Sequence, residues 1–249
     1  EALEDGNAVE TIGFNLANAS YDSVSFSVTS QETEPREVLF NTDGTKMFVI
    51  GYTGDDVNEY TLSPAYDIST ASFVDSFSIS SQEGTPQSFA FNSDGTKMYI
   101  VGQTNDTVYQ YTLSTGFDVS TASYDSVSLS VASQETTPKG LTFSSDGTKM
   151  YIVGSTNDTV YQYTLTTAYD LSTASYSSIS FSVASQATGP EGIAFNSDGT
   201  KMFILGSNTQ AAYQYTLSTA YNVSTASYDS VTLSISSQDT QPSGITFTF

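Results

Sequence analysis

Short apolar runs bounded by glycine, proline, serine and aspartate recur along the whole chain. The stretch 138–187 contains four of them, and we expect four strands, over residues 140–143, 150–153, 160–165 and 178–183. The second run is continuously apolar and ends at Gly154, as is typical of a strand covered on both faces. In the fourth run serine and apolar residues alternate, which predicts one buried and one wet face. No stretch has a convincing helical period.

The same pattern returns at a fixed interval. The phrase Asp-Gly-Thr-Lys-Met followed by Phe or Tyr begins at Asp43, Asp94, Asp146 and Asp198. Prolines mark the same repeat at intervals of 51 or 52 residues, at Pro35, Pro86, Pro138, Pro190 and Pro242. A period near 50 residues indicates a propeller or a solenoid. The gradient from two-sided to one-sided burial favours a propeller, because a solenoid buries equivalent strands equally and needs polar caps at its ends.

The sequence therefore predicts an all-β, five-bladed β-propeller with four-stranded blades in a single domain, 1–249. The first four blades are expected at about 35–85, 86–137, 138–189 and 190–241. The fifth would combine 242–249 with 1–34, and pairing of the N- and C-terminal segments would close the ring like a velcro strip. Its inner strand is expected at 244–249 and its outer strand at 22–28, with 8–13 between them. This split copy is shorter than the others, so its second strand is expected to be short or missing. The alternative is that the ends mark an excerpt from a longer propeller.

The net charge of the chain limits the kinds of partner that we expect. There are 27 acidic and 6 basic residues, giving a formal net charge of -21. This field repels nucleic acid and anionic membranes, so neither is an expected partner. No run approaches the roughly 18 apolar residues that a spanning helix needs, so no membrane insertion is expected.

Cysteine, histidine and tryptophan are absent. Their absence excludes zinc sites of the usual Cys/His kind, histidine bases and cysteine nucleophiles. Carboxylates and amides remain, and they suit calcium. We expect no cofactor, with calcium left open, and no metal ligands are assigned because no loop has the alternating Asp/Asn spacing of a calcium loop. No catalytic residue is assigned either, because the candidate groups recur symmetrically from copy to copy.

Two sets of residues are candidates for ligand binding. The position after the repeat proline varies while its neighbours repeat, and it should surround one mouth of the channel; its members are Arg36, Gln87, Lys139, Glu191 and Ser243. Unselected sequence variation at an exposed position explains these differences equally well. The loops after the second strand form the other set: Asp55, Asp56, Asn105, Asp106, Asn157 and Asp158. These side chains either bind calcium or sugar hydroxyls, or hydrogen-bond within their own loops.

The phrase Pro-x-Gly-x-x-Phe-x-x-Asp-Gly-Thr-Lys-Met resembles the lactonase-like or YVTN-type β-propeller repeat, over residues 21–249. The longer form, with Asn-Asp-Thr-Val-Tyr-Gln-Tyr at 157–163, is similar to repeats of bacteriophage virion proteins and bacterial surface proteins. The resemblance implies a non-enzymatic structural or binding module of a phage virion, such as a tail fibre, or of a cell surface. Such a module would be extracellular or virion-associated, would belong to a larger assembly, and would bind a glycan or protein surface. The alternatives are a calcium-dependent, lactonase-like hydrolase with its site in the channel, and a scaffold with no ligand.

Overall fold

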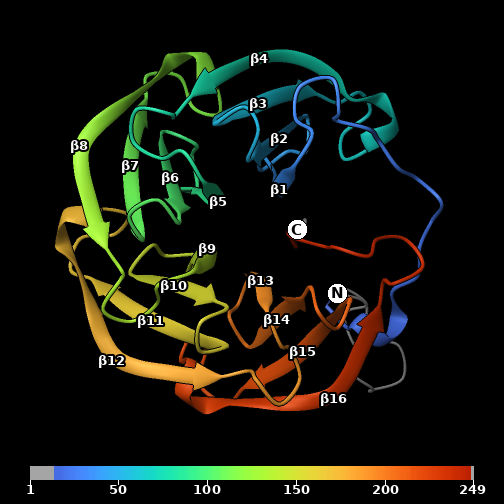
Figure 1. Cartoon of the computed structure of the whole chain (residues 1–249), viewed down its shortest axis with the longest axis vertical. Helices are drawn as coiled ribbons and strands as arrows, with labels where there is room; N and C mark the ends of the chain where they lie inside the picture. Colours follow the sequence, from blue (N-terminus) through green and yellow to red (C-terminus); the bar gives the residue numbers. More distant parts are fainter. Residues whose placement is uncertain (1–13, 248–249) are drawn as a thin grey trace, which may run out of the picture.

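The computed structural model describes residues 14–247, which form a ring of blades around a common centre (Figure 1). Four antiparallel sheets of four strands each make up most of the ring. Blade 1 contains β1 (Pro35–Phe40), β2 (Lys46–Gly51), β3 (Asp56–Thr61) and β4 (Ser72–Ser78). Blade 2 contains β5 (Pro86–Phe91), β6 (Lys97–Gly102), β7 (Thr107–Leu113) and β8 (Ala122–Ser130). Blade 3 contains β9 (Pro138–Phe143), β10 (Lys149–Gly154), β11 (Thr159–Leu165) and β12 (Ala174–Ser182). Blade 4 contains β13 (Pro190–Phe195), β14 (Lys201–Gly206), β15 (Ala211–Leu217) and β16 (Ala226–Ser234).

The prediction of five blades is wrong: the described residues form a four-bladed propeller. The remaining part of the ring, here called the fifth sector, holds residues 14–34 and 235–247, and neither segment contains a strand. Within it, residues 22–28 and 244–247 are not paired as strands, so the predicted closure by strand pairing is not formed. The physical reason is the shortness of the split copy, because inner and outer segments need intervening strands to supply ladder partners. The expected segment 8–13 and residues 248–249 lie outside the described residues.

Within a blade, burial falls from the inner to the outer strands, as predicted. In blade 3 all of β10 except its first residue is buried, whereas half-buried and exposed residues share β12. Gly147 has φ +70° in the turn between β9 and β10, and Asp146 Oδ1 accepts the Thr148 amide at 3.0 Å. A left-handed turn position of this kind favours glycine. The Asp-Gly repeat is therefore explained by turn geometry.

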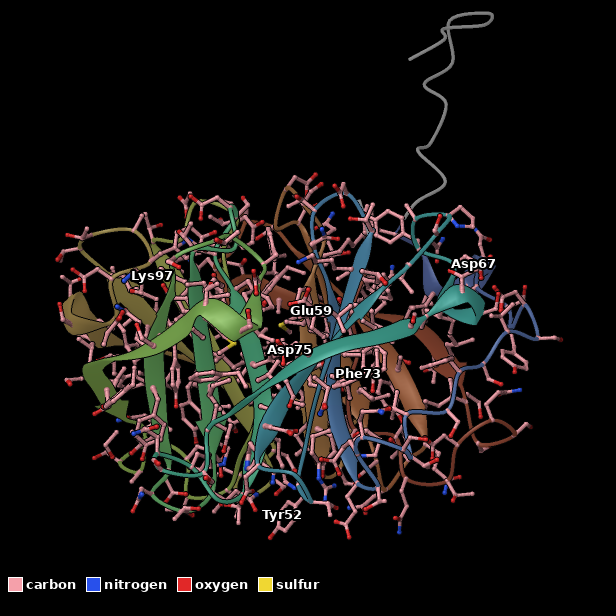
Figure 2. The ribbon with its side chains drawn as sticks, turned by 90° about the horizontal axis from the view of Figure 1, so that it is seen from above. Tyr52, Glu59, Asp67, Phe73, Asp75 and Lys97 are labelled. Atoms are coloured by element: carbon pink, nitrogen blue, oxygen red, sulfur yellow. The ribbon has the colours of Figure 1, made fainter. Side chains whose placement is uncertain are left out.

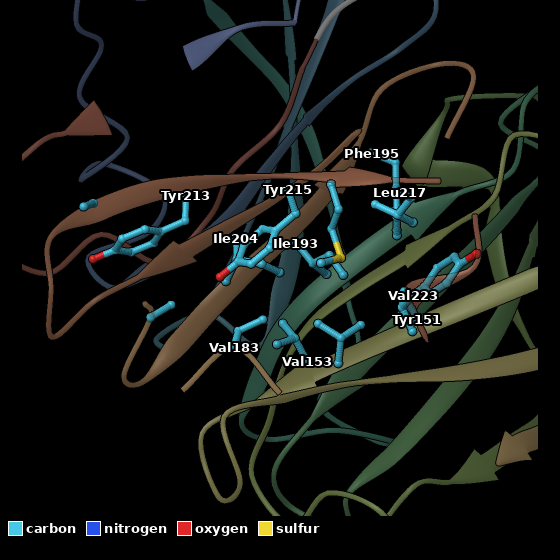
Figure 3. Packing of buried hydrophobic residues seen from close by; sticks show 14 residues of the cluster. Tyr151, Val153, Val183, Ile193, Phe195, Ile204, Tyr213, Tyr215, Leu217 and Val223 are labelled. Atoms are coloured by element: carbon cyan, nitrogen blue, oxygen red, sulfur yellow. The ribbon is translucent and has the colours of Figure 1, made fainter. Parts of the chain in front are cut away.

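The hydrophobic core lies between blades. In Figure 3, Tyr151 and Val153 of blade 3 pack with Ile193, Ile204 and Tyr215 of blade 4 in one buried cluster. Burying an aliphatic side chain of this size stabilises the fold by about 1.5–3 kcal/mol. The second strands of blades 2 and 3 are buried after their first residue because a neighbouring blade covers each face, whereas β1 borders the fifth sector and is mostly half-buried.

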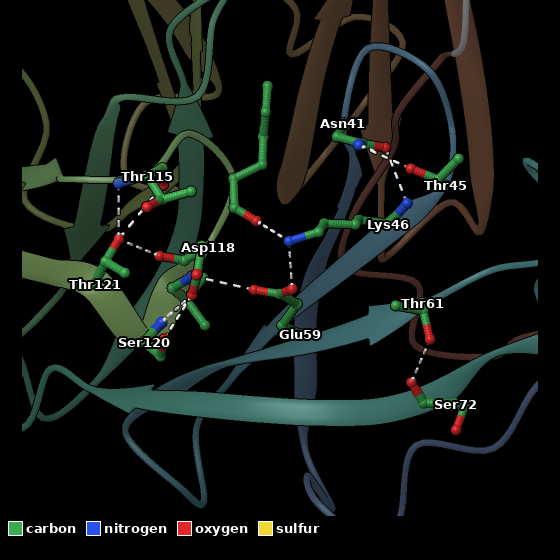
Figure 4. A network of polar contacts seen from close by, with 12 residues as sticks. Asn41, Thr45, Lys46, Glu59, Thr61, Ser72, Thr115, Asp118, Ser120 and Thr121 are labelled. Carbon is green, nitrogen blue, oxygen red and sulfur yellow. Dashed lines mark hydrogen bonds and ion pairs between the residues drawn. The ribbon is translucent and has the colours of Figure 1, made fainter.

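A buried polar side chain on each third strand also links one blade to the next segment. Glu59 Oε2 accepts the Val119 amide at 3.0 Å, and Glu59 Oε1 lies 2.7 Å from Lys46 Nζ (Figure 4). The equivalent acceptors and donors are Gln110 with Leu171 at 2.8 Å, Gln162 with Val223 at 3.3 Å, and Gln214 with Leu16 at 2.9 Å. The donors begin short 3-10 helices, namely η3 (Val119–Thr121), η4 (Leu171–Thr173), η5 (Val223–Thr225) and η1 (Leu16–Asn18). The N-terminal segment thus docks on blade 4 as the blades dock on one another.

The two faces of the ring differ in their loops, and in the edge-on view of Figure 2 Asp67 and Tyr52 mark opposite faces. The Asp67 face carries the Asp-Gly turns and the loops from third to fourth strands, which include η2 (Ile68–Thr70); Tyr66 donates its amide to Gly44 O at 2.8 Å. The Tyr52 face carries the loops between blades and those between second and third strands, joined by the bond from Tyr52 N to Glu34 O at 3.1 Å. No helix within residues 14–247 is long and apolar enough to cross a membrane.

Candidate functional site

The innermost strands nearest the channel differ at one buried position, two residues after the repeat proline. The five copies carry Glu37, Ser88, Gly140, Gly192 and Gly244 there. A Cβ at Gly140 would approach Ile193 N to 3.2 Å, and one at Gly192 would approach Ile245 N to 3.2 Å. Such contacts are tight for any side chain, so glycine allows the inner strands to approach one another. Glu37 and Ser88 break this symmetry and place two polar groups at the channel wall.

Glu37 is only 6% exposed and is held by three hydrogen bonds. Its Oε2 accepts the Ser88 hydroxyl at 3.4 Å, its Oε1 accepts the Val38 amide at 3.2 Å, and the Ile245 amide also donates to the carboxyl group. Ser88 Oγ in turn accepts the Leu141 amide at 3.1 Å. Burial outweighs these bonds and raises the pKa of Glu37 from 4.5 to about 8. At neutral pH the group is therefore mainly protonated, and it releases its proton in mildly alkaline solution.

Two cavities meet at Glu37. One, of about 530 Å³, is shared with apolar residues of all four inner strands and with residues 245–247, and it extends toward the Asp-Gly turns. The other, of about 640 Å³, lies beside the fifth sector and is lined by Arg36, Phe26 and Met47 among others. Glu37 is therefore a lining residue of both cavities.

The first set of predicted binding residues is brought together at one mouth of the channel. Lys139 Nζ lies 3.2 Å from Gln87 Oε1 and 3.2 Å from Glu191 Oε2, whereas Ser243 Oγ donates to Pro35 O at 3.1 Å. Arg36, Glu191 and Ser243 line a polar cavity of about 420 Å³. These side chains therefore lie near one another, and their role in binding stays a prediction.

Arg36 differs from the other members of that set because part of its guanidinium group has no partner. Its NH2 group lies 3.4 Å from Glu34 Oε2, and its Cζ lies 5.2 Å from the centre of the Tyr52 ring. Its buried Nε makes no hydrogen bond within residues 14–247. Arg36 and Glu37 both line the 640 Å³ cavity.

The second predicted set lies farther from the axis, in the loops between second and third strands on the Tyr52 face. Several of its members bond to side chains of the third strand that follows: Asp56 Oδ1 with Asn58 Nδ2 at 2.7 Å, Asn105 Nδ2 with Tyr109 OH at 3.2 Å, and Asn157 Nδ2 with Tyr161 OH at 3.2 Å. Asp158 Oδ1 accepts the Gly189 amide at 3.0 Å. Asp55 and Asp106 each keep one buried oxygen without a hydrogen-bond partner. The described part of the chain contains no group of three or more acidic side chains arranged to hold a metal.

Sequence reasoning missed Glu37, although a signal was present. The position directly before it was selected because it varies among the copies. At the position of Glu37 three copies have glycine, and the two exceptions are the only ones that carry polar side chains. Aligning the five copies at this position and asking where glycine is replaced by a polar residue would have identified Glu37 and Ser88.

No family model and no curated protein matches this sequence. Solved structures do resemble it. A protein from Bacteroides fragilis, provisionally named 6-phosphogluconolactonase, matches with a TM-score of 0.57 and 14% identity over 86% of this chain and 58% of its own. A similarly named protein from Bacteroides uniformis matches with a TM-score of 0.54 and 13% identity over 81% and 55%. The periplasmic gluconolactonase of Pseudomonas aeruginosa matches with a TM-score of 0.53 and 15% identity over 86% and 57%.

At this identity the likeness shows the fold alone, and the chain spans little more than half the length of each of these proteins. The lactonase-like part of the predicted resemblance is supported as a propeller built from repeats, whereas the likeness to virion and surface proteins is not shown. This comparison contradicts the prediction that the protein is not an enzyme, because these structural neighbours are named as lactonases. The symmetry argument behind it did not consider Glu37 and Ser88, where the copies differ.

Proposed function

We propose that the protein hydrolyses an uncharged lactone in the propeller channel, with Glu37 as the general base. The observation that carries the proposal is the buried carboxyl group of Glu37, which lines two cavities and has a pKa raised to about 8. Proton transfer is most efficient when the pKa of the catalytic group lies near the working pH. The lactonase names among the structural neighbours supply the reaction class.

In the proposed reaction the Glu37 carboxylate takes a proton from water as the water oxygen attacks the lactone carbonyl carbon. The ring C–O bond then breaks, and the leaving oxygen takes the proton back from Glu37, so the product is a hydroxy acid and the enzyme returns to its starting state. The unpartnered Nε–H of Arg36 is a suitable donor to the carbonyl oxygen as negative charge develops there. Ser88 is a positioning residue, because its hydroxyl donates to the Oε2 atom of Glu37.

The charge of the chain favours an uncharged substrate. A net charge of -21 repels phosphorylated sugars, and the partner of Arg36 at the channel mouth is already an acidic side chain, Glu34. A neutral sugar lactone meets no such barrier, and its hydroxyl groups could bond to the amide and charged groups of Gln87, Lys139 and Glu191.

The test is hydrolysis of three lactones: a simple aliphatic lactone, a neutral sugar lactone and a phosphorylated sugar lactone. We expect turnover of the neutral sugar lactone, with kcat/KM rising with pH through a midpoint near 8. Glu37→Gln should lower kcat/KM by at least about 100-fold, the lower range for loss of a general base. Asp75→Asn, on the exposed outer strand β4, is the control and should leave the rate unchanged. Repeating the assay in chelator tests the calcium dependence that the sequence left open. No turnover of any lactone, or a Glu37→Gln variant as active as the parent, would overturn the proposal.

A further inference from the structure

Two neighbouring blade interfaces on the Tyr52 face each hold a pair of carboxylates, in which the glutamate is buried and the aspartate is half-buried. One pair is Asp55 and Glu83, between blades 1 and 2; the other is Asp106 and Glu135, between blades 2 and 3. These are called the acidic pairs. Each glutamate belongs to a loop between blades and is 0% exposed. Each aspartate belongs to the loop between the second and third strands of the preceding blade.

One oxygen of each glutamate is fully used by the protein. Glu83 Oε1 accepts the amides of Thr85 at 2.8 Å and Thr104 at 3.0 Å. A Cβ at Gly102 would lie 2.3 Å from the carboxyl carbon of Glu83, so the glycine makes room for the buried group. Glu135 is held in the same way by the amides of Thr137 at 2.9 Å and Thr156 at 3.2 Å, against Gly154. The two loops therefore fix the position of each carboxylate.

One oxygen of each member of the acidic pairs has no hydrogen-bond partner within residues 14–247. Five buried side-chain polar atoms in residues 14–247 make no hydrogen bond, and four of them belong to the acidic pairs: Asp55 Oδ1, Glu83 Oε2, Asp106 Oδ1 and Glu135 Oε2. Burial, followed by the charge of the paired glutamate, raises the pKa of both aspartates. A buried carboxylate without a partner is costly, and two together cost more. A positive charge beside these unpartnered oxygens would therefore stabilise each acidic pair.

The third interface shows what happens when one member is replaced. Ala187 stands where the glutamate would be, and Asp158 Oδ1 accepts the Gly189 amide at 3.0 Å. This aspartate is not among the side chains with an unpartnered buried oxygen. Without the opposing glutamate, the protein satisfies the aspartate by itself.

The fourth interface has lost the other member. Gln210 replaces the aspartate and donates from Nε2 to Thr240 O at 3.0 Å, while Asp239 Oδ1 accepts the Gln241 amide at 2.7 Å. Glu32 lies at the start of blade 1, where the preceding fifth sector has no such loop. Its two oxygens accept the amides of Thr53 and Gly54, each at 3.2 Å. Unpartnered oxygens thus occur only where aspartate and glutamate are both present, within the described chain.

We propose that each acidic pair binds a divalent cation of the calcium type, which joins one blade to the next. Calcium prefers six to eight oxygen ligands. Each acidic pair supplies at most three free carboxylate oxygens, because Oε1 of the glutamate already accepts two amides, so water would complete the shell. A site with so few protein ligands belongs in the weak range, with a Kd of about 10⁻⁴–10⁻³ M. Calcium suits the pair better than magnesium, which demands a small and near-ideal octahedron.

The binding test is calorimetric titration of the full chain with calcium chloride after removal of divalent ions by chelator. We expect a stoichiometry of two. Glu83→Gln should bind one ion and the double variant Glu83→Gln, Glu135→Gln none, because glutamine keeps the Oε1 acceptor but lacks the charge. Glu32→Gln is the matched control and should still bind two. Ala187→Glu restores the missing carboxylate opposite Asp158 and should raise the stoichiometry to three.

A thermal melt with and without 10 mM calcium chloride is the second measurement, and it separates a cation from a proton shared within each pair. With a bound cation, Tm rises by several degrees with calcium in the parent protein, and the double variant shows no such rise. With a shared proton, calcium changes nothing and mild acid stabilises the parent alone. That result, or calcium binding that survives in the double variant, would overturn the proposal. Lactone hydrolysis has no part in either readout.

Discussion

The four sheets, here called the arc, and the fifth sector together complete the ring. Different interactions hold each of them in place. In the arc, each blade has four paired strands, and blades 2 and 3 bury their inner strands against a neighbouring blade on each side. In the fifth sector two unpaired segments are held by side chains that reach adjacent blades. Phe247 packs on Phe203 with ring centres 4.3 Å apart, and Phe26 meets Tyr60 at 5.8 Å. Contacts between blades are therefore enough to position a segment that has no sheet of its own.

The comparison also explains where the candidate site lies. Glu37 is on β1, the strand of the arc that borders the fifth sector. On one side it meets Ser88 of blade 2, and on the other it meets Gly244, where a Cβ would lie only 2.5 Å from Glu37 Oε1. The incomplete sector leaves the 640 Å³ cavity beside this carboxyl group. A complete fifth blade would fill that space, so within residues 14–247 the cavity beside Glu37 exists because this sector has no strands.

The largest expected difference concerns the cores of the two regions. Phe89→Ala in β5 removes a fully buried ring between blades 1 and 2, and should lower the free energy of unfolding by about 3–5 kcal/mol. Phe26→Ala removes a half-buried ring of the fifth sector and should lower it by less than about 2 kcal/mol. Urea unfolding of both variants at one pH is the measurement. Equal losses would mean that the fifth sector is packed as tightly as the arc.

The sequence predicted the strands and loops of the arc well because each blade repeats its turns and its gradient of burial. Asp146 and Gly147 mark a hairpin in any context, and an apolar run such as that of β10 needs cover on both faces. The number of blades was not predictable in the same way. The sequence shows how many copies of the repeat there are, but a blade forms only where its strands find hydrogen-bonding partners. The split copy between Pro242 and Pro35 forms no paired strands in the described residues.

The candidate site was predicted in part. The position of Arg36 and Lys139 at the channel mouth followed from variation beside a repeated proline. Glu37 was missed although it departs from the glycine of other copies, and its burial and raised pKa became visible only in the structure. The same holds for Glu83, whose second oxygen is known to lack a partner only when the surrounding loops are in place.

The second expected difference is in the pH dependence of stability, and it isolates the border between the two regions. The folded protein raises the pKa of Glu37 to about 8, so it binds this proton more tightly than the unfolded chain does. The stabilisation is complete below pH 4.5 and is lost as the pH rises toward and through 8. Between pH 5 and 8 this one group should lower the free energy of unfolding by about 3 kcal/mol.

Glu37→Gln removes this titration and is the comparison that tests it. Urea unfolding at pH 5 and pH 8 should show a smaller loss for the variant by about 3 kcal/mol. At pH 8 the variant should be more stable than the parent, so any loss of its lactone hydrolysis there would not reflect unfolding. An equal pH dependence in parent and variant would show that the carboxyl group of Glu37 is charged and solvated in the folded protein.

The smallest expected difference concerns the polar link that each third strand makes to the next segment. Gln110 and Gln214 are matched: each donates from Nε2 to an aspartate at 2.8 Å, and each accepts a buried amide, that of Leu171 or of Leu16. In Gln110→Ala the Leu171 amide stays buried, because strands of blade 3 bracket η4, and the loss should be about 1–2 kcal/mol. In Gln214→Ala the η1 segment can separate from blade 4, so water reaches the Leu16 amide and the loss should stay below about 1 kcal/mol. Hydrogen exchange should then show that residues 16–19 lose protection in Gln214→Ala, while residues 171–174 keep theirs in Gln110→Ala. Retained protection at residues 16–19 would mean that the apolar contacts of Leu16 hold this segment without the hydrogen bond, and that the fifth sector is closed by packing alone.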